Sequence, residues 1–219
     1  MIPKIIHHVW PGDDPFKEKF HRFRRTWMQH HPDWTFYFWR VVNLPDDIKT
    51  IFNNIPNISE YNVTVKSDIL RLLVVNKFGG IYVDTDMECL KPHDEFLNLE
   101  FFSGYESQDE IICPSLFGAV PKSKVTGHIL AKTLKSIKET PIEELNKSPK
   151  FSVQVYSKVL LDYVDNKMVV VYPTHYFYPV HYTERENIKR DAPDSYAKHW
   201  WSGLDADGWQ KLLTIEIEY

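Results

Sequence analysis

Several features that would assign a chain to a special class are scarce in this sequence of 219 residues. It contains eight glycines and two cysteines, Cys89 and Cys113, and neither cysteine belongs to a Cys-x-x-Cys pair. So few cysteines exclude a disulfide-rich secreted scaffold and fit two reduced thiols in a cytosolic protein. There is also no apolar run of about 18 residues and no basic-then-apolar N-terminal signal. We therefore expect no transmembrane segment and a cytoplasmic location.

Charge of one sign is not in excess either. The 30 acidic and 26 basic side chains leave a formal net charge of −4, which offers no electrostatic footprint for nucleic acid. The chain does contain 43% hydrophobic residues and a high share of aromatic residues, 15%. At this length we expect one domain over residues 1–219, with a core large enough to need no disulfide or structural metal.

Hydrophobic periodicity predicts helices that alternate with strands. Apolar, β-branched runs predict strands at 3–10, 35–40, 81–83, 101–102, 115–120 and 169–173. Apolar spacing of three and four predicts helices at 16–30, 45–54, 64–77, 122–139 and 152–164, and short strands and turns follow residue 196. This alternation indicates an α/β fold with a mixed, mostly parallel central sheet flanked by helices. Ligands of such folds bind at the carboxyl ends of the strands.

The most informative stretch is SDILRLLVVNKFGGIYVDTD at residues 67–86. Asp68 and Arg71 lie three residues apart, so they project from one face of the predicted helix. Gly79 or Gly80 supplies the left-handed turn that ends this helix and lets the chain reverse into a strand. The block therefore joins a charged helix face to the strand that follows it.

Two aspartates, Asp84 and Asp86, end that strand. If the chain stays extended they project from the same side, where two carboxylates repel each other unless a cation lies nearby. Oxygen ligands are preferred by Mg²⁺ and Mn²⁺, which often complete their shell with substrate phosphates. An Asp-x-Asp alone is more often a solvated turn. The charged helix face and the glycine pair at fixed spacing favour the metal site.

The block resembles the signature of DXD-containing glycosyltransferases of family 32. That family includes capsular-polysaccharide enzymes, fungal α-mannosyltransferases and virus-encoded relatives, and the catalytic domains of clostridial glucosylating toxins are similar. The opening IPKIIHHVW and the closing YAKHWWSG resemble its first strand and its C-terminal His-x-x-Ser element. The resemblance covers essentially the whole chain and implies a GT-A fold. It also implies metal-dependent, retaining transfer of a hexose from a nucleotide-diphosphate sugar to a glycan or protein-linked sugar, with UDP-glucose the first donor and GDP-mannose or a UDP-deoxysugar next.

The resemblance further implies roles for individual residues. The catalytic residues would be Asp68, Arg71, Asp84 and Asp86, and the first two would hold the hydroxyls of the transferred sugar. A Mn²⁺ or Mg²⁺ ion would be bound by Asp84, Asp86 and His199. Donor contacts would come from His7, Trp10, Gly80, Tyr82, Asp84, Trp200 and Ser202. The acceptor side would include Gln154, Tyr176 and Tyr178, although the aromatic residues in these sets could equally pack in the core.

The chain departs from the family's pattern in two places. The final Ser-Trp pair is stretched to Ser202 and Trp209, and the usual Gly-Pro before the late helix is replaced around Val153 and Gln154. Both regions shape the lid and the acceptor side. We expect a cytoplasmic enzyme of bacterial or viral origin in polysaccharide biosynthesis or glycosylation, and the sequence also permits one module of a larger transferase.

Two other functional classes stay open. Mg²⁺-dependent phosphohydrolases of the haloacid-dehalogenase type also place Asp-x-Asp after an apolar strand. Their motif requires Thr or Val two residues beyond the second aspartate, where this chain has Glu88, and it usually lies early in the sequence. A non-catalytic carbohydrate-binding module would be equally aromatic but would not need an Asp–Arg helix face beside a metal pair.

The ten histidines contain no zinc-binding His-Glu-x-x-His motif and no clustered Cys/His spacing. The pair His30–His31 before Pro32 is interpreted as a helix C-terminus, where an imidazolium is mildly favoured by the helix dipole. We therefore expect no zinc site.

Overall fold

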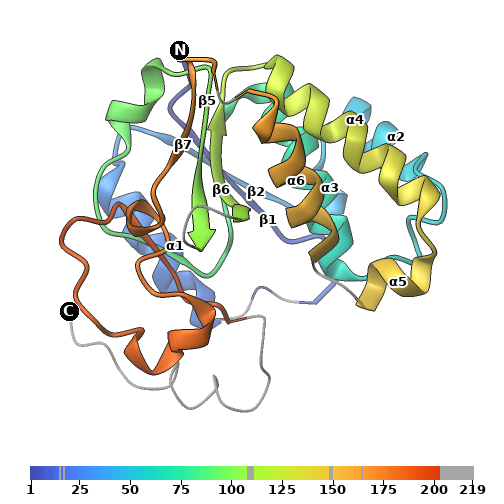
Figure 1. Ribbon diagram of the computed structural model, residues 1–219. Helices are drawn as coiled ribbons and strands as arrows, with labels where there is room; N and C mark the ends of the chain where they lie inside the picture. Colours follow the sequence, from blue (N-terminus) through green and yellow to red (C-terminus); the bar gives the residue numbers. More distant parts are fainter. Residues whose placement is uncertain (15, 17, 108–110, 148–149, 164, 203–219) are drawn as a thin grey trace.

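A six-stranded sheet lies at the centre of the computed structural model, which describes residues 1–14, 16, 18–107, 111–147, 150–163 and 165–202 (Figure 1). The strand order is β2-β1-β3-β6-β5-β7. These strands are β1 (Ile5–Val9), β2 (Thr35–Trp39), β3 (Gly80–Val83), β5 (Phe101–Ser107), β6 (Ile111–Ala119) and β7 (Val169–Tyr172). Strand β1 is parallel to β2 and β3, and β5 is parallel to β7, whereas β6 is antiparallel to both β3 and β5. The sheet is therefore mixed and mostly parallel, which confirms the predicted fold class.

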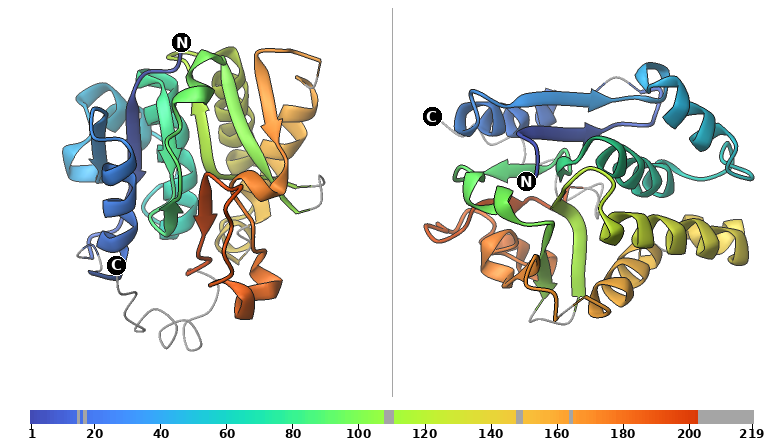
Figure 2. Two further views of the ribbon diagram at one scale, coloured as in Figure 1. Left: turned by 90° about the vertical axis from the view of Figure 1, so that its left-hand side faces the viewer. Right: turned by 90° about the horizontal axis from the view of Figure 1, so that it is seen from above.

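Helices cover one face of the sheet, and α1 with the C-terminal segment covers the other (Figure 2). The first group comprises α2 (Asp46–Asn53), α3 (Val63–Phe78), α4 (Lys124–Glu139), α5 (Ile142–Lys147) and α6 (Lys150–Leu161). On the opposite face α1 (Glu18–His30) packs against β4 (Met87–Cys89), which pairs with β8 (Ala197–His199) in a separate antiparallel ribbon. Four 3-10 helices complete the fold: η1 (Val41–Asn43), η2 (Asp94–Asn98), η3 (Thr174–Tyr176) and η4 (Tyr182–Asn187).

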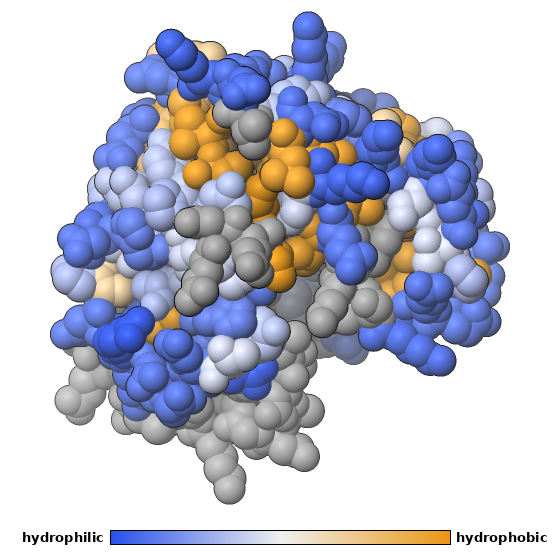
Figure 3. All heavy atoms as spheres, viewed as in Figure 1, coloured by the Kyte–Doolittle hydropathy of each residue, from blue (hydrophilic) through white to orange (hydrophobic). Residues whose placement is uncertain are grey.

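Each face of the sheet has its own hydrophobic core because neighbouring side chains on a strand point to opposite faces. On β5, Phe101 packs in the core under α3, α4 and α6, and Phe102 packs in the core on the face of α1; both are 0% exposed. Burying one such ring stabilises the fold by about 1.5–3 kcal/mol. On the outer surface, hydrophobic residues gather in front of β5 and β7, and hydrophilic residues cover most of the remaining face (Figure 3).

Helix α3 carries the first charged pair of the block, and both of its ends are fixed by specific residues. The Asn62 side chain accepts a hydrogen bond from the Val65 N–H at 3.0 Å, which caps the N-terminus. The helix ends at Gly79, and both Gly79 (φ 65°) and Gly80 (φ 96°) have left-handed backbone conformations. A Cβ on Gly79 would lie 2.6 Å from Pro121, so the turn needs glycine for space as well as for its conformation. This confirms the role predicted for the glycine pair.

Every strand and helix predicted from periodicity is present, with some changes of extent. Strands β5 and β6 are longer than expected, and β4 and α5 were not predicted. Among the described residues, no helix is both long enough and apolar enough to cross a membrane. That residues 1–219 form one domain stays a prediction.

Candidate active site

The carboxyl ends of β1 and β3 lie side by side at the same end of the sheet because these strands are parallel. Asp84 follows β3 there, and Trp10 follows β1. Strand β6 runs the other way, so residues near its start reach the same edge, and the Asp84 N–H donates to the Ser115 carbonyl at 2.8 Å. The chain then turns, and the Met87 N–H donates to the Asp84 carbonyl at 3.1 Å. Asp86 therefore lies in a turn. The prediction that Asp84 and Asp86 project from the same side assumed an extended strand, which is not what the structure has.

The first half of the site comprises Asp68, Arg71, Tyr82 and Asp84. Arg71 Nη2 lies 2.9 Å from Asp68 Oδ1 and 3.4 Å from Asp84 Oδ1, and its Nη1 donates to the Pro114 carbonyl at 3.0 Å. The guanidinium also lies over the Tyr82 ring, 4.6 Å from its centre, and the Tyr82 hydroxyl donates to Asp84 Oδ1. One cation thus fixes two carboxylates from different elements.

Burial and charge oppose each other in this half. Burial raises the pKa of Asp68, and the neighbouring Arg71 charge counteracts part of that rise. Burial alone would lower the pKa of Arg71, but Asp84 and Asp68 raise it above its usual value. The guanidinium therefore stays charged, and the chain itself supplies the counter-ion for these carboxylates.

The second half of the site is built around Asp86. Its Oδ1 lies 3.1 Å from His199 Nε2, and its Oδ2 accepts hydrogen bonds from the Ser202 N–H at 2.8 Å and the Ser202 hydroxyl at 2.9 Å. Pairing of β4 with β8 places Met87 opposite His199, which brings the imidazole next to Asp86. Trp201 has a φ of 53°, and this left-handed residue turns the chain just before the Ser202 donors.

The two ionisable groups of this half shift each other's pKa. Burial would raise the pKa of Asp86, but the His199 charge and the His199 and Ser202 hydrogen bonds lower it to about 2. Burial would lower the pKa of His199, but the Asp86 charge and hydrogen bond raise it. Each of the two groups therefore favours the charged form of the other.

Asp84, Asp86 and His199 together could hold a metal ion. Each offers one ligand atom, and these atoms all lie within 4.8 Å of one another. Two carboxylates and one imidazole form a donor set that suits a divalent cation. The residues present thus fit the Mn²⁺ or Mg²⁺ ion that the resemblance implies.

Comparison with known proteins agrees with this geometry. Residues 17–102 match the protein family described as "Glycosyltransferase sugar-binding region containing DXD motif". These residues are therefore similar to the DXD-containing glycosyltransferases. The match includes the helix of Asp68 and Arg71 and the turn of Asp84 and Asp86, whereas His199 and Ser202 lie beyond it.

Curated relatives of this glycosyltransferase region include fungal mannosyltransferases. "Inositol phosphoceramide mannosyltransferase 1" of Schizosaccharomyces pombe is 27% identical over 127 residues, which cover 55% of this chain and 39% of the relative. "Initiation-specific alpha-1,6-mannosyltransferase" of Candida albicans is 28% identical over 110 residues, 44% of this chain and 27% of the relative. The matched part thus spans well under half the length of these relatives. The region that the family model and these relatives match is thus similar to glycosyltransferases.

Solved structures show the same GT-A fold. "PaToxG Glycosyltransferase" has a TM-score of 0.58 at 17% identity and covers 75% of this chain and 70% of its own. The "UDP-bound glycosyltransferase domain from the YGT toxin" has a TM-score of 0.54 at 11% identity, with 78% and 79% covered. The GT-A fold implied by the resemblance is therefore confirmed.

Two residues predicted to bind the donor do not reach this edge of the glycosyltransferase fold. His7 is fully buried, its Nδ1 accepts from the Trp39 indole at 2.9 Å, and its Nε2 bonds the Gly79 carbonyl at 2.8 Å. Gly80 begins β3 at the opposite edge from Asp84, where a Cβ would lie 2.7 Å from the Ile5 carbonyl. Both positions secure the turn between α3 and β3, so their predicted contact with the donor is corrected.

Tyr82 and Trp10 both lie near the site, but their side-chain contacts were not predicted from the sequence. Tyr82 is almost completely buried, so it positions Asp84 through its hydroxyl and does not line an open pocket. Trp10 is half-buried at the end of β1, where its indole donates to the Asp14 carbonyl at 3.0 Å and its ring meets Phe16 edge-on. Base stacking by Trp10 stays a prediction.

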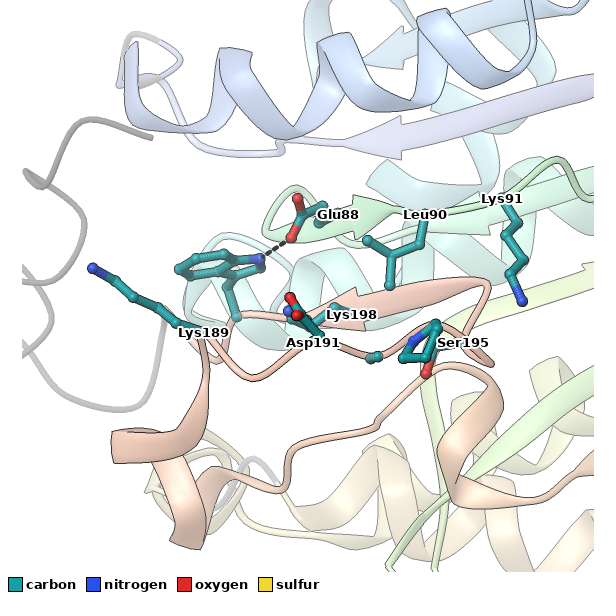
Figure 4. A pocket seen from close by; sticks show the side chains of 10 residues that line it. Glu88, Leu90, Lys91, Lys189, Asp191, Ser195 and Lys198 are labelled. Atoms are coloured by element: carbon teal, nitrogen blue, oxygen red, sulfur yellow. Dashed lines mark hydrogen bonds between the residues drawn. The ribbon is translucent and has the colours of Figure 1, made fainter. Parts of the chain in front are cut away.

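Trp200 lies on the other side of the β4–β8 ribbon. Glu88 pairs with Lys198 across the ribbon, and alternation points these two away from the side that carries Met87 and His199. The Trp200 indole donates to Glu88 Oε2 at 2.9 Å and lines a cavity of about 740 Å³ on that side (Figure 4). The other lining residues are Leu90, Lys91, Lys189, Asp191, Ala192, Pro193, Ser195 and Lys198. Asp68, Asp84 and Asp86 do not line this cavity, and Trp200 meets Asp86 only through its backbone N–H, which donates to the Asp86 carbonyl at 3.0 Å, so the donor contact of the Trp200 side chain stays a prediction.

The residues predicted for the acceptor side are dispersed. Gln154 is exposed on α6, and Tyr176 stacks on Tyr172 and Tyr196 at centroid distances of 4.7 and 5.5 Å. Tyr178 is buried, with its ring centre 6.0 Å from that of His199 and its hydroxyl donating to the Cys113 carbonyl at 3.4 Å. Only Tyr178 thus adjoins the candidate metal ligands. The stretched element that includes Trp209 lies outside the described residues.

Proposed function

We propose that this chain transfers a hexose from a nucleoside-diphosphate sugar to a hydroxyl of a sugar-containing acceptor. The convergence of Asp84, Asp86 and His199 at the carboxyl edge of the sheet carries this proposal, because the buried Asp68–Arg71 pair lies directly beside them. The arrangement offers a divalent-cation site next to polar groups that could hold sugar hydroxyls. The fungal relatives named mannosyltransferases support transfer of a hexose.

Asp84, Asp86 and His199 would hold the ion in this proposal. When bound, the ion would offset the negative charge that develops on the departing diphosphate. Because Mg²⁺ prefers oxygen ligands and one donor here is an imidazole nitrogen, we expect Mn²⁺ to be the better activator. His199 would give up its extra proton when the ion binds, since an imidazolium has no free lone pair.

Asp68 and Arg71 would orient the transferred sugar. Arg71 already uses Nη1 and Nη2 to hold Pro114, Asp68 and Asp84, so it acts chiefly by fixing the carboxylates. The Asp68 carboxylate would accept hydrogen bonds from sugar hydroxyls. Its close pairing with a guanidinium makes it a poor covalent nucleophile, which favours retention through front-side attack with the departing phosphate oxygen as proton acceptor.

The donor and acceptor are assigned by class. UDP-glucose remains the first donor, because one protein of similar fold was solved with UDP. GDP-mannose is tested beside it because the fungal relatives are named mannosyltransferases, and UDP-deoxysugars follow. The acceptor is a glycan or a protein-linked sugar, and the chain could act as one module of a larger transferase. The cytoplasmic location and the bacterial or viral origin stay predictions.

A panel of nucleotide sugars tests the proposal. The chain is incubated with each donor and a mixture of sugar acceptors, in Mn²⁺, in Mg²⁺ and in EDTA, and released nucleoside diphosphate and glycosylated product are quantified by chromatography. We expect turnover of at least one donor that needs the divalent ion and is lost in Asp86→Asn. Release of phosphate from phosphate monoesters without turnover of any donor would favour the phosphohydrolase. Sugar binding without any turnover would favour the binding module.

A further inference from the structure

We propose that His31, Cys89 and His93 form a second metal site, which binds one thiophilic ion, Zn²⁺ or Cu⁺. Potential ligand atoms of these three residues all lie within 4.8 Å of one another. They come from separate elements, since His31 follows α1, Cys89 ends β4 and His93 precedes η2. This inference does not depend on the transferase activity, because it concerns residues outside the acidic site.

The cluster is sealed from solvent. His31 and His93 are 0% exposed and Cys89 is 2% exposed. The His93 ring packs against aromatic rings, with centroid distances of 4.8 Å to Trp27, 5.5 Å to Phe96 and 6.1 Å to Phe177. Polar groups buried among such rings are unfavourable unless they have partners, so three polar side chains meeting here require an explanation.

His93 provides the observation that points to a ligand. By hydrogen-bond geometry neither of its buried ring nitrogens has a partner within the described part of the chain, although the Lys91 backbone lies near enough to offset part of the effect of burial on the His93 pKa. Buried nitrogens are nearly always paired, and an unpaired one often marks a missing ion or water. Burial also lowers the pKa of His93 well below its usual range, so the ring is neutral and keeps a lone pair for a metal.

His31 has the tautomer that a metal ligand needs. Its Nε2 accepts the His93 backbone N–H at 3.0 Å, so the ring proton is on Nδ1, which donates to the Trp27 carbonyl at 3.0 Å. A ligating histidine commonly donates its second nitrogen to a carbonyl in this way. To bind the ion, Nε2 exchanges one backbone hydrogen bond for a metal bond, and the ligand atoms draw in to the roughly 3.5 Å spacing of a tetrahedral zinc site.

Cys89 determines which ions fit. Its thiol donates to the Lys91 carbonyl at 3.3 Å, and burial raises its pKa well above the usual range, so without an ion it stays protonated. On binding, the S–H bond breaks, the sulfur donates its pair to the ion and one proton is released to solvent. One thiolate and two imidazoles suit Zn²⁺ or Cu⁺, whereas Mn²⁺ and Mg²⁺ prefer the oxygen-rich acidic site.

An ion here would stabilise the elements that position Asp86 and His199. It would join the end of α1 to the segment between β4 and η2, and β4 begins directly after Asp86. The indole of Trp27 already donates to the Met87 carbonyl at 2.8 Å, and Thr26 Oγ1 accepts the Cys89 N–H at 2.8 Å. The ion would therefore complete an existing connection between α1 and the ribbon that bears Asp86 and His199.

Metal analysis of the full chain tests the site without any substrate. The chain is dialysed against EDTA to strip the acidic site, and its metals are quantified by plasma mass spectrometry. A second sample is unfolded, stripped and refolded with Zn²⁺, with Cu⁺ under reductant, or with Co²⁺. We expect about one ion per chain in at least one sample, with a thiolate-to-metal absorption band in the Co²⁺ form. The ion retained identifies Zn²⁺ or Cu⁺ as the natural occupant.

Matched variants separate this site from adventitious binding. His93→Leu keeps an apolar side chain of similar bulk, and Cys89→Ala removes the sulfur; each is expected to lower retained metal at least tenfold while circular dichroism shows a folded chain. Cys113→Ala is the control, because Cys113 is also buried but its thiol donates to Ser115 Oγ. The proposal is overturned if the native chain carries no ion after isolation and after each refolding. It is equally overturned if Cys113→Ala loses the ion as fully as Cys89→Ala.

Discussion

The two halves of the acidic site balance their charges by different means. In the half built from α3 and β3, Arg71 lies 2.9 Å from Asp68 and 3.4 Å from Asp84. In the half built from the β4–β8 ribbon, Asp86 lies 3.1 Å from the imidazole of His199. Arginine stays protonated in proteins, whereas histidine titrates near neutral pH and is a common metal ligand. The first half therefore carries a permanent counter-ion, and the second carries one that a proton or a metal can replace.

This difference in counter-ions indicates a different role for each half of the site. A permanent ion pair holds its carboxylates in place whether or not substrate is present. In the proposed mechanism, the Asp86 charge would be balanced by the His199 proton before the ion binds and by the ion afterwards. Changes to the Asp68–Arg71 pair should thus act largely alike with and without metal, and changes to Asp86 and His199 should depend on metal and pH.

Asp86→Asn is expected to have the largest effect. Asparagine keeps an oxygen for the Ser202 donors but loses the charge that holds a divalent ion, so Mn²⁺-dependent turnover should fall by about 10³-fold. Donor kcat/KM and calorimetric binding of the Mn²⁺–nucleotide sugar measure the loss. Asp162→Asn, an exposed aspartate at the end of α6, is the control and should behave as the native chain. Unchanged donor affinity in Mn²⁺ would refute the metal role of Asp86.

Arg71→Met should chiefly affect stability. Without the guanidinium, Asp68 and Asp84 are left as unpaired carboxylates, and breaking a buried pair costs about 3–5 kcal/mol in the free energy of unfolding. Urea unfolding should show most of this loss in both Mn²⁺ and EDTA, because Asp68 is not a proposed metal ligand; only Asp84 would regain a cation from Mn²⁺. The double variant Asp68→Asn with Arg71→Met should lose less than Arg71→Met alone. A loss that appears only in EDTA would contradict the division between the halves.

The first half was predictable because it lies within one short block. Helical spacing puts Asp68 and Arg71 on one face, and a glycine-terminated helix leads directly into the strand of Asp84. The sequence could not show that the Pro114 carbonyl on β6 completes the Arg71 contacts, because 43 residues separate the two. Nor could it show that Tyr82 points inward, since a buried tyrosine and a pocket tyrosine have the same local pattern.

In the second half, Asp86 was predicted from the Asp-x-Asp pattern, but its partner His199 rested on resemblance alone, because 113 residues separate the two. Only the pairing of β4 with β8 brings them together, and strands of three residues have too little periodicity to be predicted. His7 and Gly80 were placed in the donor site by the resemblance, but both lie where α3 turns into β3. The His31, Cys89 and His93 cluster was missed for the related reason that 62 residues separate its histidines. Such spacing matches no zinc motif.

The pH dependence of metal binding should separate the halves further. His199 has a pKa raised above its ordinary 6.5, so in EDTA its pairing stabilises the fold below pH 6.5 and is lost as the pH rises through the raised pKa. Asp86 has a pKa lowered from 3.8 to about 2, so its contribution is lost as the pH falls through that range. Mn²⁺ must displace the His199 proton, so its affinity should rise by about tenfold per pH unit until His199 is neutral.

Calorimetric titration of Mn²⁺ between pH 5.5 and 8.5 measures this dependence, and two buffers of different ionisation enthalpy report the released proton. His199→Asn is the matched variant and should bind Mn²⁺ more weakly with a much flatter pH profile. An affinity of the native chain that does not change with pH would show that His199 is not a ligand.

Ser202→Ala should give the smallest of these effects, because it removes only one of two hydrogen bonds to Asp86 Oδ2 and leaves the Ser202 N–H donor in place. Loss of a group that orients a metal ligand usually lowers metal affinity by about 10–100-fold, and the retained backbone bond sets the expectation at the lower end, about tenfold. Calorimetric Mn²⁺ affinity measures it, and the free energy of unfolding in EDTA should fall by only about 1 kcal/mol. Ser202→Thr retains the hydroxyl and should restore the affinity. The contrary result would be a Ser202→Ala variant in which Arg71→Met no longer lowers the free energy of unfolding. The two halves would then be one coupled network, and the distinction between a permanent and an exchangeable counter-ion would be wrong.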